Sequence, residues 1–196
     1  MTLFLSLFAC TDVQDDGTLP DHNHEVITRV ELELEPVAGG DLIVASWSDS
    51  EMDGNPVVEG LSLPIDGDFA LTVRFFNELE EPAEELSSEV LEAGEEHQIF
   101  FTGDLVGPGT DAEDGLVEHV YADQDSSGLP LGLENTLTVL DIGAGELVVT
   151  LRHMPPVGDT PSKEADLAEL LSEEGFVALP GDNDVQVSFP LEILGE

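Results

Sequence analysis

Three histidines stand at or near the ends of apolar stretches, and imidazole nitrogen is a common ligand of transition metals. His153 ends one alternating apolar stretch, and His97 begins another directly after Glu95 and Glu96. His119 lies within a third stretch of this kind. Two or three imidazole nitrogens with a carboxylate would suit zinc or copper. The alternative is that each histidine is a hydrogen-bonded residue at a strand end, because no H-x-H or H-E-x-x-H spacing occurs after residue 25.

The two other histidines lie in the acidic segment near the N-terminus. His22 and His24 form an H-N-H motif between Asp21 and Glu25. A His-x-His pair can capture a transition metal, although a flexible pair alone selects no geometry. The residues leave open whether this segment binds a metal or is only a solvated linker.

Two loops place acidic residues at alternate positions before a glycine, a pattern that can bring oxygen ligands together around calcium. The first contains Asp49, Glu51 and Asp53, and the second contains Asp123 and Asp125. Neither loop completes an EF-hand, because the first lacks the final glutamate and proline and glycine interrupt the second. The alternative is that both loops are turns without a ligand.

Enzymatic motifs are missing from the sequence. No G-x-S-x-G nucleophile motif and no glycine-rich phosphate-binding motif occurs, and the chain holds a single cysteine. A sugar-binding cleft usually needs more aromatic surface than one Trp and one Tyr provide. We therefore predict a protein that is not an enzyme.

Charge restricts the partners of this chain. Its 196 residues include 44 Asp and Glu but only 4 Lys and Arg, which gives a formal net charge of -40. The basic residues Arg29, Arg74, Arg152 and Lys163 are scattered singly, which excludes nucleic acid and anionic membrane surfaces as partners. A hydrophobic content of 41% is too high for an acidic disordered chain. The acidic side chains are therefore expected to lie on the surface of one folded domain.

The N-terminal sequence indicates a location in the cell envelope. Residues 1–10 are an apolar run that ends in Leu7-Phe8-Ala9-Cys10, which resembles the lipobox of a bacterial lipoprotein signal sequence. Cys10 would carry the lipid, and the polar residues 11–25 would form an acidic flexible tether to a domain at 26–196. The run is short for a complete signal, so we expect the natural start to lie further upstream. The alternative is a buried strand with a free thiol.

Apolar and polar residues alternate in eight stretches, which is typical of strands that have one buried face. These stretches are 26–35, 42–47, 69–77, 97–102, 116–122, 135–142, 146–153 and 184–193. Loops rich in Gly, Pro and Asp join them, and only 82–93 and 162–174 favour short surface helices. The pattern predicts an all-β antiparallel sandwich, in which Pro190 marks the last stretch as an edge strand or a bulge.

Several segments, in order over residues 25–193, resemble a family of small secreted bacterial lipoproteins of unknown function. These segments include VITRVELELEPVAGGD, SWSDSEMDGNP, EEHQIFFTG, LRHMP and NDVQVSFPLEI. The family is common in marine and gliding Gram-negative bacteria. The resemblance implies a β fold and an envelope location and assigns no catalytic residue. Its members are sometimes labelled type 1 periplasmic-binding folds, a fold that needs a longer chain of alternating strands and helices.

Two hypotheses of function follow. The first is a lipid-anchored binding protein of the outer membrane, with a divalent metal such as Zn, Cu or Ca as its ligand. The second is a structural or interaction module of the outer membrane that assists an outer-membrane receptor and takes no small ligand.

Overall fold

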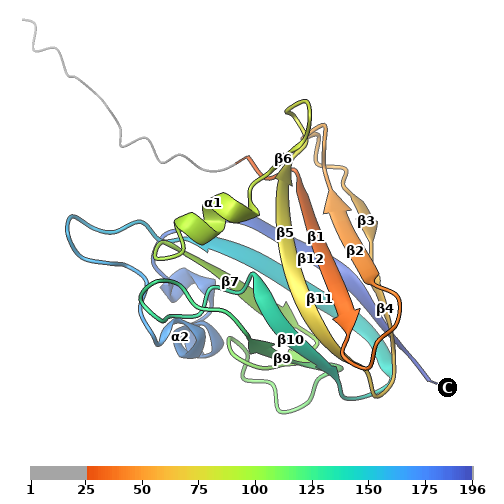
Figure 1. Ribbon diagram of the computed structural model, residues 1–196. Coiled ribbons are helices and arrows are strands. Elements are labelled where there is room, and N and C mark those ends of the chain that lie inside the picture. The colour runs from red at the N-terminus through yellow and green to blue at the C-terminus, as the bar shows by residue number, and fades with distance from the viewer. Residues whose placement is uncertain (1–25, 196) are drawn as a thin grey trace, which may run out of the picture.

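Two β-sheets pack face to face in the computed structural model, which describes residues 26–195 (Figure 1). The large sheet contains, in spatial order, β3 (Val57–Glu59), β2 (Ile43–Ser48), β1 (Arg29–Pro36), β5 (Asp68–Asn77), β10 (Glu134–Val139), β9 (Val117–Tyr121) and β8 (Leu105–Val106), with β6 (Glu84–Glu85) beside β5. The small sheet contains β4 (Leu61–Pro64), β12 (Asp182–Leu194), β11 (Gly143–His153) and β7 (His97–Gly103). The expected all-β sandwich is confirmed. The expected signal sequence, Cys10, His22 and His24 lie outside the described residues.

Side chains from the inner faces of both sheets form the main core. Leu32 and Phe75 from the large sheet and Phe101, Leu147 and Phe189 from the small sheet are completely buried. Each sits at an alternate position of its strand, as the sequence pattern predicts. Burial of a side chain of this size contributes roughly 1.5–3 kcal/mol to folding, so this interface holds the sheets together.

The structure adds short strands and two parallel pairings to the expected antiparallel pattern. Strands β3, β4, β6 and β8 span two to four residues each, and only β4 alternates between buried and exposed residues. Strand β4 runs parallel to the end of β12, and β8 runs parallel to β9. Over residues 182–190, which include Pro190, β12 pairs only with β11 and also contains a bulge, so the expectation of an edge strand or a bulge is confirmed there. Beyond Pro190, residues 191–194 pair with β4 on the other side, and this part of the strand is not an edge.

Both expected helices are present but shorter than the sequence suggests. Helix α1 spans Ser87–Glu92, because the preceding Glu84–Glu85 pairs with β5 as β6. Helix α2 spans Leu167–Glu174 and is followed by the 3-10 turn η1 (Phe176–Ala178). The apolar side of α2 packs on Phe100 of β7 in a second, smaller core. Strand β7 is therefore buried on both faces.

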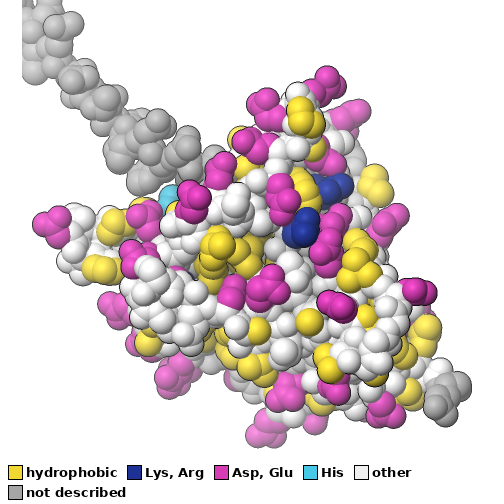
Figure 2. All heavy atoms as spheres, viewed as in Figure 1, with side chains coloured by type: hydrophobic (Ala, Val, Ile, Leu, Met, Phe, Trp, Pro, Cys, Tyr) yellow, Lys and Arg dark blue, Asp and Glu magenta, His cyan; other side chains and the backbone are white. Residues whose placement is uncertain are grey.

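Acidic side chains are scattered over the visible surface, among uncharged and hydrophobic ones, and they far outnumber the basic ones (Figure 2). Arg29 contacts Glu31 and Glu78 at 3.5 and 3.6 Å, and Arg74 contacts Glu33 at 3.3 Å. Because these pairs are partly exposed, each stabilises the fold by no more than about 1 kcal/mol. Within residues 26–195, no helix has the length and apolar character needed to cross a bilayer.

Candidate metal centre

Three neighbouring strands of the small sheet bring two imidazoles and a carboxylate together at one end. His97 begins β7 and His153 ends β11, and the two residues are direct partners in the register of these strands. Their rings stack with centroids 4.7 Å apart and planes 12° apart. Asp184 in β12 places its Oδ2 3.5 Å from His97 Nε2. One ligand atom from each residue lies within 4.8 Å of the other two, which defines the His97-His153-Asp184 cluster.

A β-bulge brings Asp184 into this cluster. The register of β12 with β11 runs from Val185 opposite Leu151 to Asn183 opposite Arg152, so Asp184 is the extra residue of the bulge. A bulge re-aims a side chain that regular alternation would direct elsewhere. The sequence did not point to Asp184, because the apolar alternation of this strand begins only at Val185. No sequence pattern marks the bulge.

Arg152 fixes the turn that leads into this bulge. Its guanidinium donates hydrogen bonds to the carbonyls of Leu179, Pro180 and Gly181 and, at 2.8 Å, to Asn183 Oδ1. Burial lowers the pKa of Arg152, and the charge of the nearby acids opposes that shift. Because an arginine keeps its proton even so, Arg152 donates these hydrogen bonds to the turn at every physiological pH. Gly181 has a φ of 73° and lies against the carbonyl of His153, so a larger residue would displace the end of β11.

The backbone sets the tautomer of His97. Its Nδ1 lies 3.0 Å from the carbonyl oxygen of Ala93, which can only accept a hydrogen bond. Nδ1 therefore carries a proton, and Nε2 is the nitrogen directed at Asp184. Metal-binding histidines commonly donate the second ring N–H in this way, which fixes the ring orientation. As an N–H, Nε2 forms an ion pair with the carboxylate of Asp184, and as a lone pair it can share a cation with that carboxylate.

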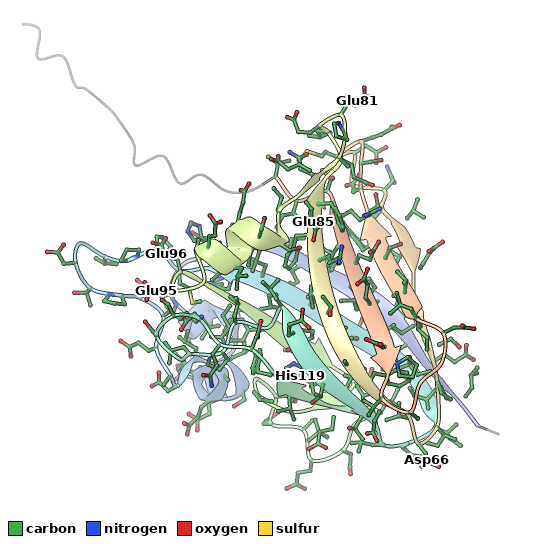
Figure 3. The ribbon with its side chains drawn as sticks, viewed as in Figure 1. Asp66, Glu81, Glu85, Glu95, Glu96 and His119 are labelled. Atoms are coloured by element: carbon green, nitrogen blue, oxygen red, sulfur yellow. The ribbon has the colours of Figure 1, made fainter. Side chains whose placement is uncertain are left out.

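Of the two adjacent glutamates, only Glu96 reaches the cluster. Glu96 Oε2 lies 3.4 Å from His153 Nε2, and the side chain of Glu96 is 40% exposed. Glu95 instead accepts hydrogen bonds from the hydroxyls of Ser126 and Ser127 at 2.6 and 2.8 Å. Its pKa is lowered by these two hydrogen bonds. Glu96 can therefore supply an oxygen as the fourth ligand, whereas Glu95 supports the neighbouring loop (Figure 3).

The structure does not bring His119 to the cluster. This residue is completely buried in the main core, where its ring packs 4.1 Å from that of Phe101 and its Nε2 lies 2.9 Å from Asn135 Oδ1. Burial lowers the pKa of His119 to about 4, partly offset by the hydrogen bond to Asn135. It is thus a neutral core residue at neutral pH. Figure 3 shows it well apart from Glu95 and Glu96.

In the second acidic loop, the carboxylates accept hydrogen bonds from groups of the protein. Asp123 accepts the backbone N–H groups of Gly132, Leu133 and Glu134 at 2.7–3.0 Å. Asp125 accepts two further backbone N–H groups and the ammonium of Lys163. Because these oxygens already have donors, the geometry favours a structural turn over a calcium site.

The first acidic loop is also an internally bonded turn. Asp49 accepts the backbone N–H groups of Asp53 and Gly54 at 3.1 and 3.0 Å, and Asp53 accepts that of Asn55 at 2.9 Å. Glu51 lies exposed beside them. Asx-type bonds of this kind form wherever acids precede a glycine in a turn, so they explain the sequence pattern without an ion.

Comparison with family models, with curated proteins and with solved structures found no match to this chain.

Proposed function

We propose that this protein is a lipid-anchored binding protein of the cell envelope that takes Zn²⁺ or Cu²⁺ at the His97-His153-Asp184 cluster. The observation that carries the proposal is that these residues, from three strands, place their ligand atoms within 4.8 Å of one another. Two imidazoles and one carboxylate suit these borderline metals better than calcium, which prefers an all-oxygen set. Copper would bind more tightly than zinc in the same ligand set.

Metal binding requires a change in one ring. Stacked parallel imidazoles direct their in-plane lone pairs along separate lines, so both cannot point at one ion. His153 is the ring that can turn, because its side chain is 14% exposed whereas that of His97 is 4% exposed. Rotation of His153 would bring its nitrogen toward His97 Nε2 and Asp184 Oδ2, with Glu96 or water as the fourth ligand.

Titration calorimetry of metal-free protein tests the metal site. We expect ZnCl₂ and CuCl₂ to bind one equivalent tightly and CaCl₂ to bind weakly. The variants His97→Ala and Asp184→Asn should weaken zinc binding by more than the roughly 10- to 100-fold that loss of an outer hydrogen-bond partner costs. Asp53→Asn removes a carboxylate from an exposed turn and should leave the affinity unchanged.

The double variant His22→Ala, His24→Ala separates the cluster from the N-terminal histidines. If this variant loses tight binding while His97→Ala retains it, the proposed site is wrong. If no metal binds to the intact protein, the alternative of an interaction module without a small ligand is favoured.

The envelope location is supported by the sequence around Cys10 and by the polar segment that follows it. Expression of the full-length gene in a Gram-negative host should give a mature chain that starts at an acylated Cys10, as measured by intact mass. The Cys10→Ala variant should leave the membrane fraction. A mature chain that retains Met1 would refute the anchor.

A further inference from the structure

The only lysine of the chain is buried, although the surface is covered with acids that could pair with it. The side chain of Lys163 is 1% exposed, and that of its partner Asp125 is 0% exposed. Lysine is almost never buried without a partner, and a buried ion pair often costs more in desolvation than its attraction returns. Both side chains are therefore shielded from bulk water and meet it only at the small cavity that they line.

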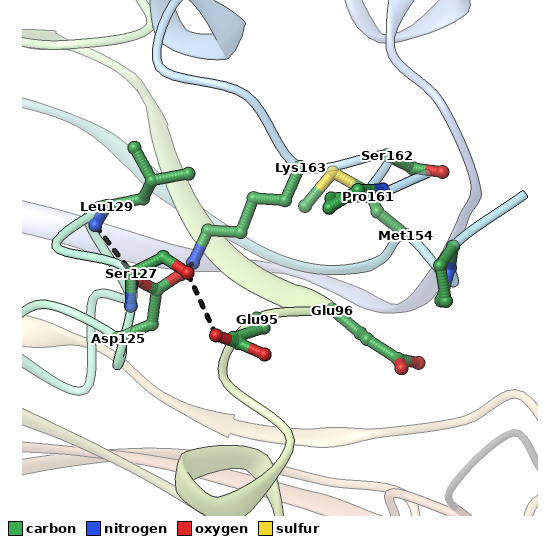
Figure 4. A pocket seen from close by; sticks show the side chains of 10 residues that line it. Glu95, Glu96, Asp125, Ser127, Leu129, Met154, Pro161, Ser162 and Lys163 are labelled. Carbon is green, nitrogen blue, oxygen red and sulfur yellow. Dashed lines mark hydrogen bonds and ion pairs between the residues drawn. The ribbon is translucent and has the colours of Figure 1, made fainter. Parts of the chain in front are cut away.

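The contacts of this pair hold an amine against one carboxyl oxygen, next to the carboxyl carbon (Figure 4). Lys163 Nζ lies 2.7 Å from Asp125 Oδ2 and donates to the carbonyl of Gly94 at 2.8 Å. Asp125 Oδ1 accepts the backbone N–H groups of Ser127 and Leu129, both at 2.9 Å. Two N–H groups on one oxygen stabilise the negative charge that develops there when a nucleophile adds to the carbon.

We propose that Lys163 and Asp125 join in an intramolecular amide cross-link. The ammonium first passes one proton to Oδ2 along the existing hydrogen bond, which leaves a neutral amine beside a carboxylic acid. The amine then attacks Cγ, and Oδ1 holds the charge of the tetrahedral intermediate. A second proton moves from nitrogen to Oδ2, the Cγ–Oδ2 bond breaks, and one water molecule leaves. The remaining N–H belongs to the new amide, so atoms and charge balance without another reactant.

Position and burial favour this condensation. The 2.7 Å contact holds the two groups together. Well-oriented intramolecular groups reach an effective concentration on the order of 10⁵ M or more, which offsets the unfavourable loss of water. Burial lowers the pKa of Lys163 and so favours the neutral amine. Burial acts in the opposite direction on Asp125, but its hydrogen bonds outweigh it and hold the pKa low, so the ion pair is the resting form. A cavity of about 120 Å³ beside the pair gives the leaving water a path.

A cross-link here would connect segments that no strand pairing joins. Residues 125 and 163 are 38 positions apart, in the loop between β9 and β10 and in the segment before α2. A covalent bond between them restricts the unfolded chain as a disulfide does, in a protein whose single cysteine allows no disulfide within the chain. This proposal does not depend on metal binding.

Intact mass of the purified folded protein, followed by tryptic peptide mapping after denaturation, tests the cross-link. We expect the wild-type chain to be lighter than its sequence by one water and trypsin not to cleave after Lys163. Peptides 75–152 and 153–196 should then appear as one joined species. Lys163→Arg keeps the charge but should restore the full mass and lower the melting temperature. Asp125→Asn should form the same bond with loss of ammonia.

Mapping is needed because dehydration at an Asp-Gly step also removes one water. Wild-type protein that retains its full mass, or that yields separate peptides 153–163 and 164–196, would overturn the proposal. A mass loss that persists in Lys163→Arg would also overturn it.

Discussion

His119 links stability to pH through a single buried ring. Its pKa is about 4 in the folded protein against 6.5 for an ordinary histidine, so the unfolded chain binds the proton more tightly between these values. Stability contributed by the neutral ring is therefore complete above pH 6.5 and is lost as the pH falls toward 4. The shift corresponds to about 3 kcal/mol.

We expect His119→Leu to remove this part of the pH dependence. Urea unfolding, followed by the fluorescence of Trp47, measures the free energy of unfolding of both proteins at pH 7 and pH 4.5. The wild type should lose about 2–3 kcal/mol more than the variant between these conditions. Because the carboxylates titrate in both proteins, only the difference reports on His119. Equal losses would show that the ring is not held neutral by burial.

At the scale of elements, α2 protects the outer face of β7. Leu171 of α2 is 5% exposed and packs in the small core with Phe100. Leu171→Ala should destabilise the protein by about 2–4 kcal/mol in thermal or urea unfolding, through lost burial and a residual cavity. Leu91→Ala in α1 is the matched control, because Leu91 is 56% exposed and should cost less than about 0.5 kcal/mol. Similar losses for both variants would contradict the role of α2 as a cover.

The strands that carry the site could be predicted from the sequence, but their geometry could not. Alternation located β11 and β12, because one face of each is apolar over at least three alternate positions, and it located β7 from the pair Ile99 and Phe101. It also placed His97 and His153 at strand ends. It could not show that β7 and β11 are neighbours, because pairing between distant segments leaves no local pattern. The bulge that adds Asp184 is likewise a property of the register between two strands.

For the acidic loops, the sequence alone does not distinguish a metal site from a turn. Alternate acids before glycine suit both a calcium loop and an Asx turn, since both use the same oxygens. Only the positions of backbone N–H groups around Asp49 and Asp123 separate these interpretations. In the same way, nothing in the sequence showed that Lys163 would be buried.

At the scale of the whole molecule, net charge governs the response to salt. With -40 on one chain and few ion pairs, repulsion between surface carboxylates opposes the compact state. Raising NaCl shortens the screening length from about 10 Å at 0.1 M to about 3 Å at 1 M. We expect the melting temperature to rise across this series, because the compact state gains more from screening than the unfolded chain. A flat or falling melting temperature would show that the carboxylates are too well solvated to repel one another strongly.

Nuclear magnetic resonance of the histidine side chains shows which imidazoles bind a metal. A two-dimensional ¹H–¹⁵N spectrum that reports both ring nitrogens should be recorded before and after one equivalent of ZnCl₂. We expect the His97 and His153 resonances to shift, with zinc on His97 Nε2 and the proton retained on Nδ1. The resonances of His119, His22 and His24 should stay in place. Shifts confined to His22 and His24, or no shift in any ring, would contradict metal binding at the His97-His153-Asp184 cluster.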